Sequence, residues 1–297
     1  MFKSGFIGII GRPNVGKSTL LNALIGERIA IATHKPQTTR NRIMGIKNVE
    51  NGQLIFLDTP GIHQATTLLN RYMVHTARDT FGDSDLLLLV VEADAGCVEG
   101  DRSIIDSLRE GKRPVILAVN KIDLVEKSQL LPLFDEFQNL YPFAALIPLS
   151  ALKGKGLDVL LAEVWKLLPE GPQYFPEEMM TDRSERFIAA EIIREKVILQ
   201  TRQEIPYAMA VVVDSFKERE DSDLLRIQAT ILVEKESQKG ILIGKKGAML
   251  KKIGTEARLS LENFFGTRVF LELFVKVRKD WTRDAKMLQE LGYGDKS

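Results

Sequence analysis

The sequence predicts an α/β protein in two domains, the first with a mostly parallel sheet and the second a smaller α+β domain. Three observations support this. Short runs of Val, Ile and Leu recur at the spacing of strands that alternate with helices. A segment with three prolines in eight residues, 169–176, interrupts the alternation, and the order of elements changes after it. At 297 residues the chain is long enough for two hydrophobic cores.

The first domain, 1–168, is predicted from five apolar runs separated by helical segments, among them 18–24 and 101–110. Strands with a continuous apolar sequence are buried on both faces, so they imply a parallel sheet covered by helices on both sides. The five predicted strands are 6–10, 54–57, 86–91, 115–119 and 145–148.

The second domain, 184–297, is predicted to follow a linker over 169–183. Its pattern indicates the order α-β-β-α-α-β with a tail helix. We expect a helix over 184–201, strands over 209–216 and 225–233, a loop at 244–247, a helix to about 264, a strand over 268–277 and the tail helix over 281–291.

Composition is that of a globular protein, with 44% hydrophobic and 27% charged residues. Cys97 is the only cysteine, which excludes a disulfide within the chain and a cluster of thiolate ligands. The apolar runs are too short to span a membrane, and the first of them leads into a glycine-rich loop instead of a cleavage site. We therefore expect a cytoplasmic protein.

The residues from Gly11 to Ser18 match the pattern G-x-x-x-x-G-K-[ST] between a predicted strand and a predicted helix, the context that a phosphate-binding loop requires. Backbone N–H groups surround phosphate oxygens there, Lys17 neutralises charge, and the Ser18 hydroxyl binds Mg²⁺. The predicted phosphate-binding residues are Gly11, Arg12, Pro13, Asn14, Val15, Gly16, Lys17, Ser18, Thr19 and, from a later loop, Gly61.

Two later motifs indicate which nucleotide binds. Asp58-Thr-Pro-Gly61 follows one predicted strand, where Asp58 can reach a metal-bound water and the Gly61 N–H a γ-phosphate. Asn120-Lys-Ile-Asp123 follows another, and Asp123 can accept hydrogen bonds from the N1–H and 2-amino groups of guanine, a donor pair that adenine lacks. The predicted guanine-binding residues are Asn120, Lys121, Asp123, Ser150, Ala151 and Leu152, with the Ala151 N–H facing O6.

In the second domain, Gly244-Lys-Lys-Gly247 lies between two predicted helices. Its glycines let the backbone approach a nucleic acid closely, and its lysines can contact phosphates. Residues 239–283 include eleven basic and four acidic side chains, a local charge of +7 in a chain whose net charge is +1, which favours an RNA-binding surface over a merely solvated face. The predicted RNA-binding residues are Ile241, Ile243, Gly244, Lys245, Lys246, Gly247, Lys251, Lys252 and Arg258.

The ordered nucleotide motifs resemble those of the translation-factor-related class of P-loop GTPases, and the GxxG domain resembles a type II KH domain. Together, over essentially the whole chain, they resemble the Era family. This resemblance implies a GTP-hydrolysing switch that binds the 3′ end of 16S rRNA and acts in the assembly of the small (30S) ribosomal subunit and in rRNA maturation. It also implies peripheral association with the inner membrane. We expect a monomer.

The same resemblance implies two switch segments. Thr39 would bind Mg²⁺ together with Ser18 and Asp58 when a γ-phosphate is present, and Thr38 is the competing candidate. The switch residues are Thr38, Thr39, Asp58, Thr59, Pro60, Gly61 and Ile62.

Ile62 stands where many small GTPases have a glutamine that orients the attacking water, which predicts slow intrinsic hydrolysis. Asn14 resembles the asparagine associated with activation by K⁺ in related GTPases, so K⁺ is an expected cation beside Mg²⁺.

Three alternatives remain open from the sequence. The chain could be a P-loop ATPase or kinase with an RNA-binding appendage, although the NKID motif argues against adenine. It could be a regulatory GTPase that couples the cell cycle or the membrane state to growth. It could also be a purely structural RNA-binding protein with a vestigial nucleotide site.

Overall fold

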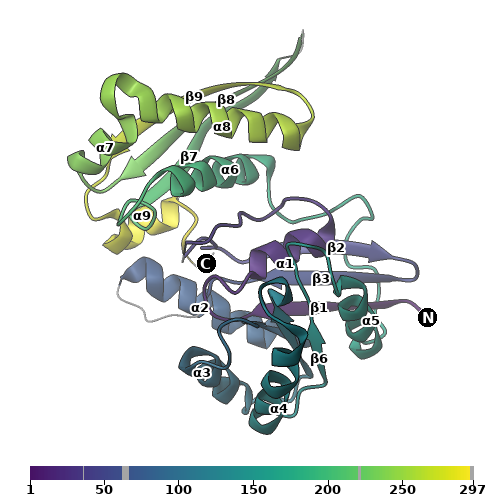
Figure 1. Ribbon diagram of the computed structural model, residues 1–297. Coiled ribbons are helices and arrows are strands. Elements are labelled where there is room, and N and C mark those ends of the chain that lie inside the picture. The colour runs from purple at the N-terminus through teal and green to yellow at the C-terminus, as the bar shows by residue number, and fades with distance from the viewer. Residues whose placement is uncertain (36, 62–66, 220–221, 295–297) are drawn as a thin grey trace. The chain divides into compact units, whose positions relative to one another are not determined.

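The computed structural model describes residues 1–35, 37–61, 67–219 and 222–294, which fold into two compact units (Figure 1). The first unit comprises Met1–Ala65 and Met73–Asp182, and the second comprises Thr66–Tyr72 and Arg183–Ser297. Each has its own sheet and its own core.

A six-stranded sheet in the order β2-β3-β1-β4-β5-β6 forms the centre of the first unit. Only β2 is antiparallel to its neighbour, so the predicted mostly parallel sheet is confirmed. The apolar runs of the sequence do not predict β2, because its outward residues are partly exposed and it lacks a continuous apolar run. The strands are β1 (Lys3–Ile10), β2 (Ile43–Val49), β3 (Gly52–Asp58), β4 (Leu86–Glu92), β5 (Val115–Asn120) and β6 (Ala145–Pro148).

Helices cover both faces of this sheet (Figure 1). On one face, Ile104 of α3 and Phe137 of α4 belong to the core formed with β4 and β5. On the other, Leu21 of α1 and Trp165 of α5 lie against glycines of β2 and β3, where a larger residue would collide with them. The helices are α1 (Lys17–Ile25), α2 (Leu68–Asp83), α3 (Glu99–Leu108), α4 (Leu130–Leu140) and α5 (Leu157–Leu167), with short 3₁₀ turns at Ile122–Leu124 and Lys127–Gln129.

The predicted linker 169–183 is attached to the first unit over most of its length. The Ser4 N–H donates to Pro169 O at 3.2 Å, and the Ile46 N–H donates to Met180 O at 2.8 Å. Between them, the buried Gln53 Oε1 accepts the N–H groups of Tyr174 and Phe175, both at 3.0 Å. A Pro-rich sequence does not predict backbone hydrogen bonds of this kind.

We expect Gln53→Ala to lower the free energy of unfolding of the first unit by about 2–4 kcal/mol, because two backbone N–H groups lose their acceptor inside the structure. Gln173→Ala is the matched control: Gln173 is exposed, and its side chain donates to Phe175 O, two residues away, so its loss should cost less than about 0.5 kcal/mol. Urea unfolding of both variants measures the difference, and equal midpoints would show that Gln53 does not hold the segment.

The second unit confirms the predicted order α-β-β-α-α-β. Its sheet has the order β7-β8-β9, with β7 antiparallel and β9 parallel to β8. One face packs against α6 and α8 through Ile193, Ala257 and Leu261. The elements are α6 (Glu185–Gln200), β7 (Met209–Arg219), β8 (Ser222–Val233), α7 (Glu236–Ile243), a 3₁₀ turn at Lys245–Gly247, α8 (Ala248–Phe265) and β9 (Arg268–Val277).

The tail differs from the single helix expected over 281–291. It forms a 3₁₀ turn, Trp281–Arg283, and a short helix, α9 (Ala285–Glu290). The break falls at Asp284, whose extended backbone lets its carboxylate accept the N–H groups of Lys286 and Met287 and cap α9. Within the described residues, no helix is both long enough and apolar enough to cross a lipid bilayer.

Candidate nucleotide and nucleic-acid sites

The predicted phosphate loop, 11–18, connects the carboxyl end of β1 to the start of α1. Gly16 precedes α1 with a φ of 99°, and a Cβ there would lie 2.3 Å from the Asn120 amide nitrogen, so only glycine fits. The first turn of α1 has no acidic residue, which leaves the positive end of the helix dipole uncompensated. Anions are favoured at such a terminus.

Lys17 is buried, and its Nζ donates to the backbone carbonyls of Gly11 at 3.0 Å and Arg12 at 2.7 Å. Burial lowers the pKa of Lys17 to about 8, against the opposing effect of the Asp58 carboxylate. An ammonium held by two carbonyls in a buried site is poorly compensated, so a phosphate group there would stabilise its charge.

Three predicted metal ligands lie together beside this lysine. The Ser18 hydroxyl donates to Asp58 Oδ2 at 2.7 Å and lies 2.7 Å from the Thr39 hydroxyl, which is 3.4 Å from the same carboxylate oxygen. Asp58 is fully buried, and its Oδ1 has no hydrogen-bond partner among the described residues. Burial raises the pKa of Asp58 to about 6, while Lys17 and the two hydroxyls oppose the shift.

This oxygen cluster fits Mg²⁺, a hard cation that takes oxygen ligands and commonly uses only one or two carboxylates. Within the described residues, no group of three or more His, Cys, Asp and Glu side chains could hold a metal ion. Thr38 lies differently, because its hydroxyl is 2.6 Å from the Thr33 hydroxyl and donates to Lys35 O at 2.6 Å.

The residues after Asp58 lie against the phosphate loop. The Thr59 hydroxyl donates to Ile9 O at 2.9 Å, Pro60 is buried, and a Cβ on Gly61 would lie 2.7 Å from the Pro13 nitrogen. The Gly61 backbone thus lies so close to the phosphate loop that a side chain at this position would collide with Pro13. Ile62, where a water-orienting glutamine is absent, lies outside the described residues.

On the predicted guanine side, Asn120 connects three loops. Its Nδ2 donates to Val15 O in the phosphate loop at 2.8 Å, and its Oδ1 accepts the Ala151 N–H at 3.0 Å. The N–H expected to face guanine O6 is therefore engaged with Asn120 in this structure. Asp123 is exposed, and a hydrogen bond from the Ser150 hydroxyl lowers its pKa, while Leu152 is 74% exposed. The carboxylate expected to read guanine is open to a ligand and remains charged.

Two acidic residues next to these loops are not indicated by the sequence motifs. Arg12 donates from Nε to Asp101 Oδ1 at 2.8 Å, and its Nη2 lies 3.5 Å from Glu92 Oε2. Glu92 also pairs with Lys121. Asp101 is fully buried at the start of α3, and burial raises its pKa against the effect of Arg12. Glu92 ends β4 at the same sheet edge, which is the signal that could have identified it.

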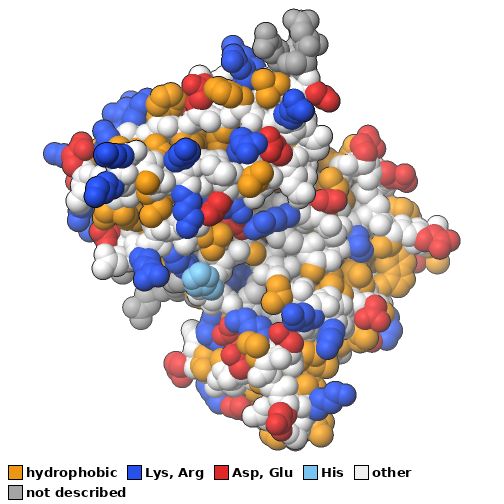
Figure 2. Space-filling model, turned by 45° about the horizontal axis from the view of Figure 1, so that its top comes forward, with side chains coloured by type: hydrophobic (Ala, Val, Ile, Leu, Met, Phe, Trp, Pro, Cys, Tyr) orange, Lys and Arg blue, Asp and Glu red, His pale blue; other side chains and the backbone are white. Residues whose placement is uncertain are grey.

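The GxxG loop separates α7 from α8 in the second unit. Gly244 has a φ of 71°, and a Cβ there would lie 2.7 Å from that of Met249. Lys246 also has a positive φ, 51°. Lys245, Lys246, Lys251 and Lys252 are all exposed. Figure 2 shows several Lys and Arg side chains on the face of this domain that is in view.

The other predicted RNA-binding residues divide into two groups. Ile241 is 51% exposed beside the loop, whereas Ile243 is half-buried. Arg258 lies ten residues along α8 from its first residue, which is about 15 Å of helix. Its guanidinium forms an ion pair with Glu262 at 2.8 Å. The structure therefore does not bring Arg258 into the lysine cluster at the loop.

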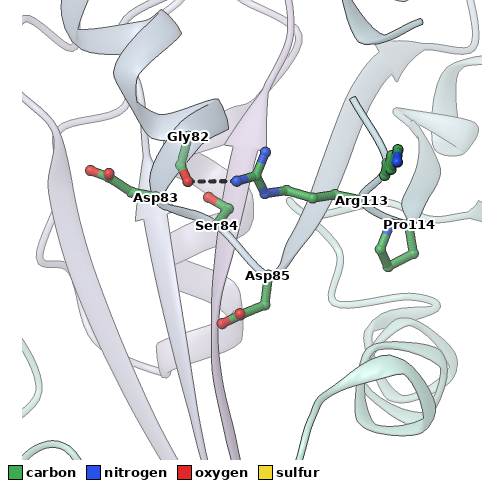
Figure 3. Close-up of a pocket in the computed structure, with 7 residues that line it drawn as sticks. Gly82, Asp83, Ser84, Asp85, Arg113 and Pro114 are labelled. Carbon is green, nitrogen blue, oxygen red and sulfur yellow. Dashed lines mark hydrogen bonds between the residues drawn. The ribbon is translucent and has the colours of Figure 1, made fainter. Parts of the chain in front are cut away.

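A pocket at the amino ends of β4 and β5, opposite the nucleotide edge, contains none of the predicted residues (Figure 3). Arg113 donates to Gly82 O at 2.7 Å within it, and Asp83 forms an ion pair with Arg42 at 2.6 Å. These polar groups bond to neighbouring parts of the chain, so the pocket adds nothing to the nucleotide site. It is lined by Gly82, Asp83, Ser84, Asp85, Lys112, Arg113 and Pro114.

Comparison with known proteins agrees with this geometry. Residues 6–121 match the family model described as 50S ribosome-binding GTPase, and residues 204–282 match the KH domain model. The fold and the site thus define a P-loop GTPase with a C-terminal KH domain. The chain is 68% identical to GTPase Era of Syntrophus aciditrophicus over 99% of its own length and 96% of the relative's. The chain belongs to the Era family of GTPases.

Other relatives extend the comparison. GTPase Era of Geobacter metallireducens is 58% identical over 98% of each chain. A Tyr-to-Ala variant of Aquifex aeolicus Era bound to GDP·AlF4⁻ has a TM-score of 0.96 and 42% identity, covering 99% of this chain and all of that one. A structure of Era with MgGDPNP and nucleotides 1506–1542 of 16S ribosomal RNA matches with the same values.

Proposed function

We propose that this protein binds and hydrolyses GTP with Mg²⁺, binds the 3′ end of 16S rRNA through its KH domain, and acts in assembly of the small ribosomal subunit. The main observation in support of GTP binding and hydrolysis is the cluster of Ser18, Thr39 and Asp58 at the start of α1. The relatives bound to GDP·AlF4⁻, and to MgGDPNP with 16S rRNA, support both the nucleotide-binding and the RNA-binding parts of the proposal.

In this proposal, each residue has a stated role in binding. Lys17 Nζ exchanges its two carbonyl acceptors for oxygens of the β- and γ-phosphates. Ser18 and Thr39 would hold Mg²⁺ through their hydroxyls, together with the Asp58 carboxylate. The bound Mg²⁺ would neutralise the charge that develops on the phosphate oxygens. The Gly61 N–H donates to the γ-phosphate, which draws the two switch segments together.

We also propose that K⁺ assists hydrolysis beside Asn14. Asn14 is exposed in the phosphate loop with a φ of 69°, so its side-chain oxygen is available to a monovalent cation next to bound phosphates. GTP turnover should be several-fold faster in KCl than in NaCl at equal ionic strength, and Asn14→Ala should remove the difference. Equal rates of the unaltered protein in the two salts would contradict this.

The RNA half is tested by replacing the loop lysines. Lys245→Ala with Lys246→Ala should weaken binding to a 16S 3′-end oligonucleotide. It should also reduce the slope of log K against log salt by about 0.7 for each phosphate that the variant no longer binds, because each phosphate neutralised on a single strand releases about that many counterions. Fluorescence anisotropy over a salt series measures both quantities.

Lys112→Ala with Lys127→Ala is the charge-matched control, since both lysines are exposed on the first unit and should leave the slope unchanged. The assay is run with GDP and with GDPNP. An unchanged slope in the loop variant would show that the GxxG loop does not contact the RNA phosphates. Equal RNA affinities with GDP and with GDPNP would show that the bound nucleotide does not control RNA binding.

A further inference from the structure

The KH sheet has a second face that the GxxG loop does not use. Residues alternate between the two faces of a strand, and Val269, Leu271 and Leu273 of β9 point into the core with α6 and α8. Phe270 and Phe274 must therefore point to the opposite face. They are 44% and 49% exposed, which is unusual for two phenylalanines on one edge strand.

Cations surround these rings on the same face. Arg226 of β8 is paired in register with Phe270, and its guanidinium lies 5.2 Å from the ring centroid. Lys217 is opposite Arg226, while Arg268 and Lys276 lie on the face of β9 with the two rings. Within the described residues, none of these four cations forms an ion pair with a carboxylate.

Among the described residues, the two carboxylates on this face are bonded to uncharged neighbours instead. Gln228 donates to Glu272 Oε2 at 2.8 Å, and the Thr230 hydroxyl donates to Asp214 Oδ2 at 2.7 Å. The face therefore combines two exposed rings, about 13 Å apart along the strand, with a net positive charge. Aromatic rings on a sheet stack unpaired bases, and nearby cations contact the phosphates.

We propose that this open face, formed by Lys217, Arg226, Arg268, Phe270, Phe274 and Lys276, is a second binding surface for single-stranded RNA. This inference rests on the function proposed above only because it takes RNA as the ligand. A protein partner or a second copy of the chain would be expected to bury the rings without needing the cations, so the charge favours RNA. Since β9 is an edge strand, an RNA held at the GxxG side can continue around that edge to this face.

The test uses the full-length protein and a fluorescein-labelled single-stranded RNA of about 20 nucleotides. Phe270→Leu with Phe274→Leu keeps apolar side chains on the strand but removes the rings. Its affinity should fall at least about five-fold, because stacking of one base on an aromatic residue contributes at least that factor. Leu259→Ala, an exposed apolar residue on α8, is the control and should change nothing. Far-UV circular dichroism verifies the fold of each variant.

Ultraviolet crosslinking with peptide mapping separates the two surfaces. In the unaltered protein, we expect crosslinks at Phe270 and Phe274, and they should persist when Lys245 and Lys246 are replaced by alanine. In the unaltered protein, crosslinks at the rings without any at the GxxG loop would count against the function proposed above and not against this surface. Unchanged affinity without crosslinks at either ring would overturn the inference. So would a change in the sedimentation coefficient of the leucine variant without RNA, since that would indicate self-association.

Discussion

Asp123→Asn is expected to change the base that this protein binds from guanine to xanthine. The carboxylate can accept both the N1–H and the 2-amino group of guanine. An asparagine amide would place its own NH₂ donor against the 2-amino group of guanine, so two donors would face each other. Xanthine has a carbonyl oxygen at position 2, which can accept a hydrogen bond from that NH₂. We expect GTP affinity to fall at least about 10³-fold and XTP affinity to rise, because a site built for a hydrogen-bond pattern rejects a ligand that lacks it strongly.

Fluorescent nucleotide competition measures this change, and Asp135→Asn is the matched control on an exposed position of α4. Ser150→Ala should weaken GTP binding far less than Asp123→Asn, because the Ser150 hydroxyl acts on the base through the Asp123 carboxylate, whose pKa it holds low. If Asp123→Asn still bound GTP as tightly as before, Asp123 would not be the group that recognises the base.

Thr39→Ala is expected to reduce the GTP hydrolysis rate by roughly 10- to 100-fold at saturating nucleotide, the loss typical of removing one group around a metal or a developing charge. The Thr39 hydroxyl lies with Ser18 and Asp58. In the function proposed above it binds Mg²⁺ together with the γ-phosphate, so its loss should weaken the metal site in the GTP state and not in the GDP state. The Mg²⁺ concentration for half-maximal activity should rise, while GDP affinity stays nearly constant.

Thr38→Ala is the control that the structure supplies. The two threonines are adjacent and both buried, but the Thr38 hydroxyl bonds to Thr33 and to Lys35 O. We expect its replacement to leave the Mg²⁺ dependence unchanged. A shift in Mg²⁺ dependence for Thr38→Ala without one for Thr39→Ala would show that Thr38, and not Thr39, binds the metal.

The sequence was most informative where the chemistry requires a particular residue type at a fixed spacing. Gly11 to Ser18 had to follow a strand and open a helix, because only that arrangement places backbone N–H groups around a phosphate. The same holds for Gly244 and Gly247, whose positive φ angles terminate one helix and begin the next. Apolar runs located the strands whose two faces are buried.

Other features depend on contacts between distant segments, which a local pattern does not contain. The Arg12–Asp101 pair joins residues 89 positions apart, and the local pattern around Asp101 indicates only a helix. Gln53 determines the course of 174–175 through hydrogen bonds that span more than 120 residues. Thr38 and Thr39 are indistinguishable in sequence, and only the fold shows which hydroxyl lies near Asp58.

The bonds of Asn120 to Val15 O and the Ala151 N–H connect the loop expected to bind the base to the phosphate loop. In the function proposed above, the segments around Thr39 and Gly61 respond to the γ-phosphate, whereas Asn120 does not contact it. Affinity for the nucleotide and discrimination between GTP and GDP thus reside in different parts of one site. A variant could lose the conformational signal and still hold its nucleotide tightly.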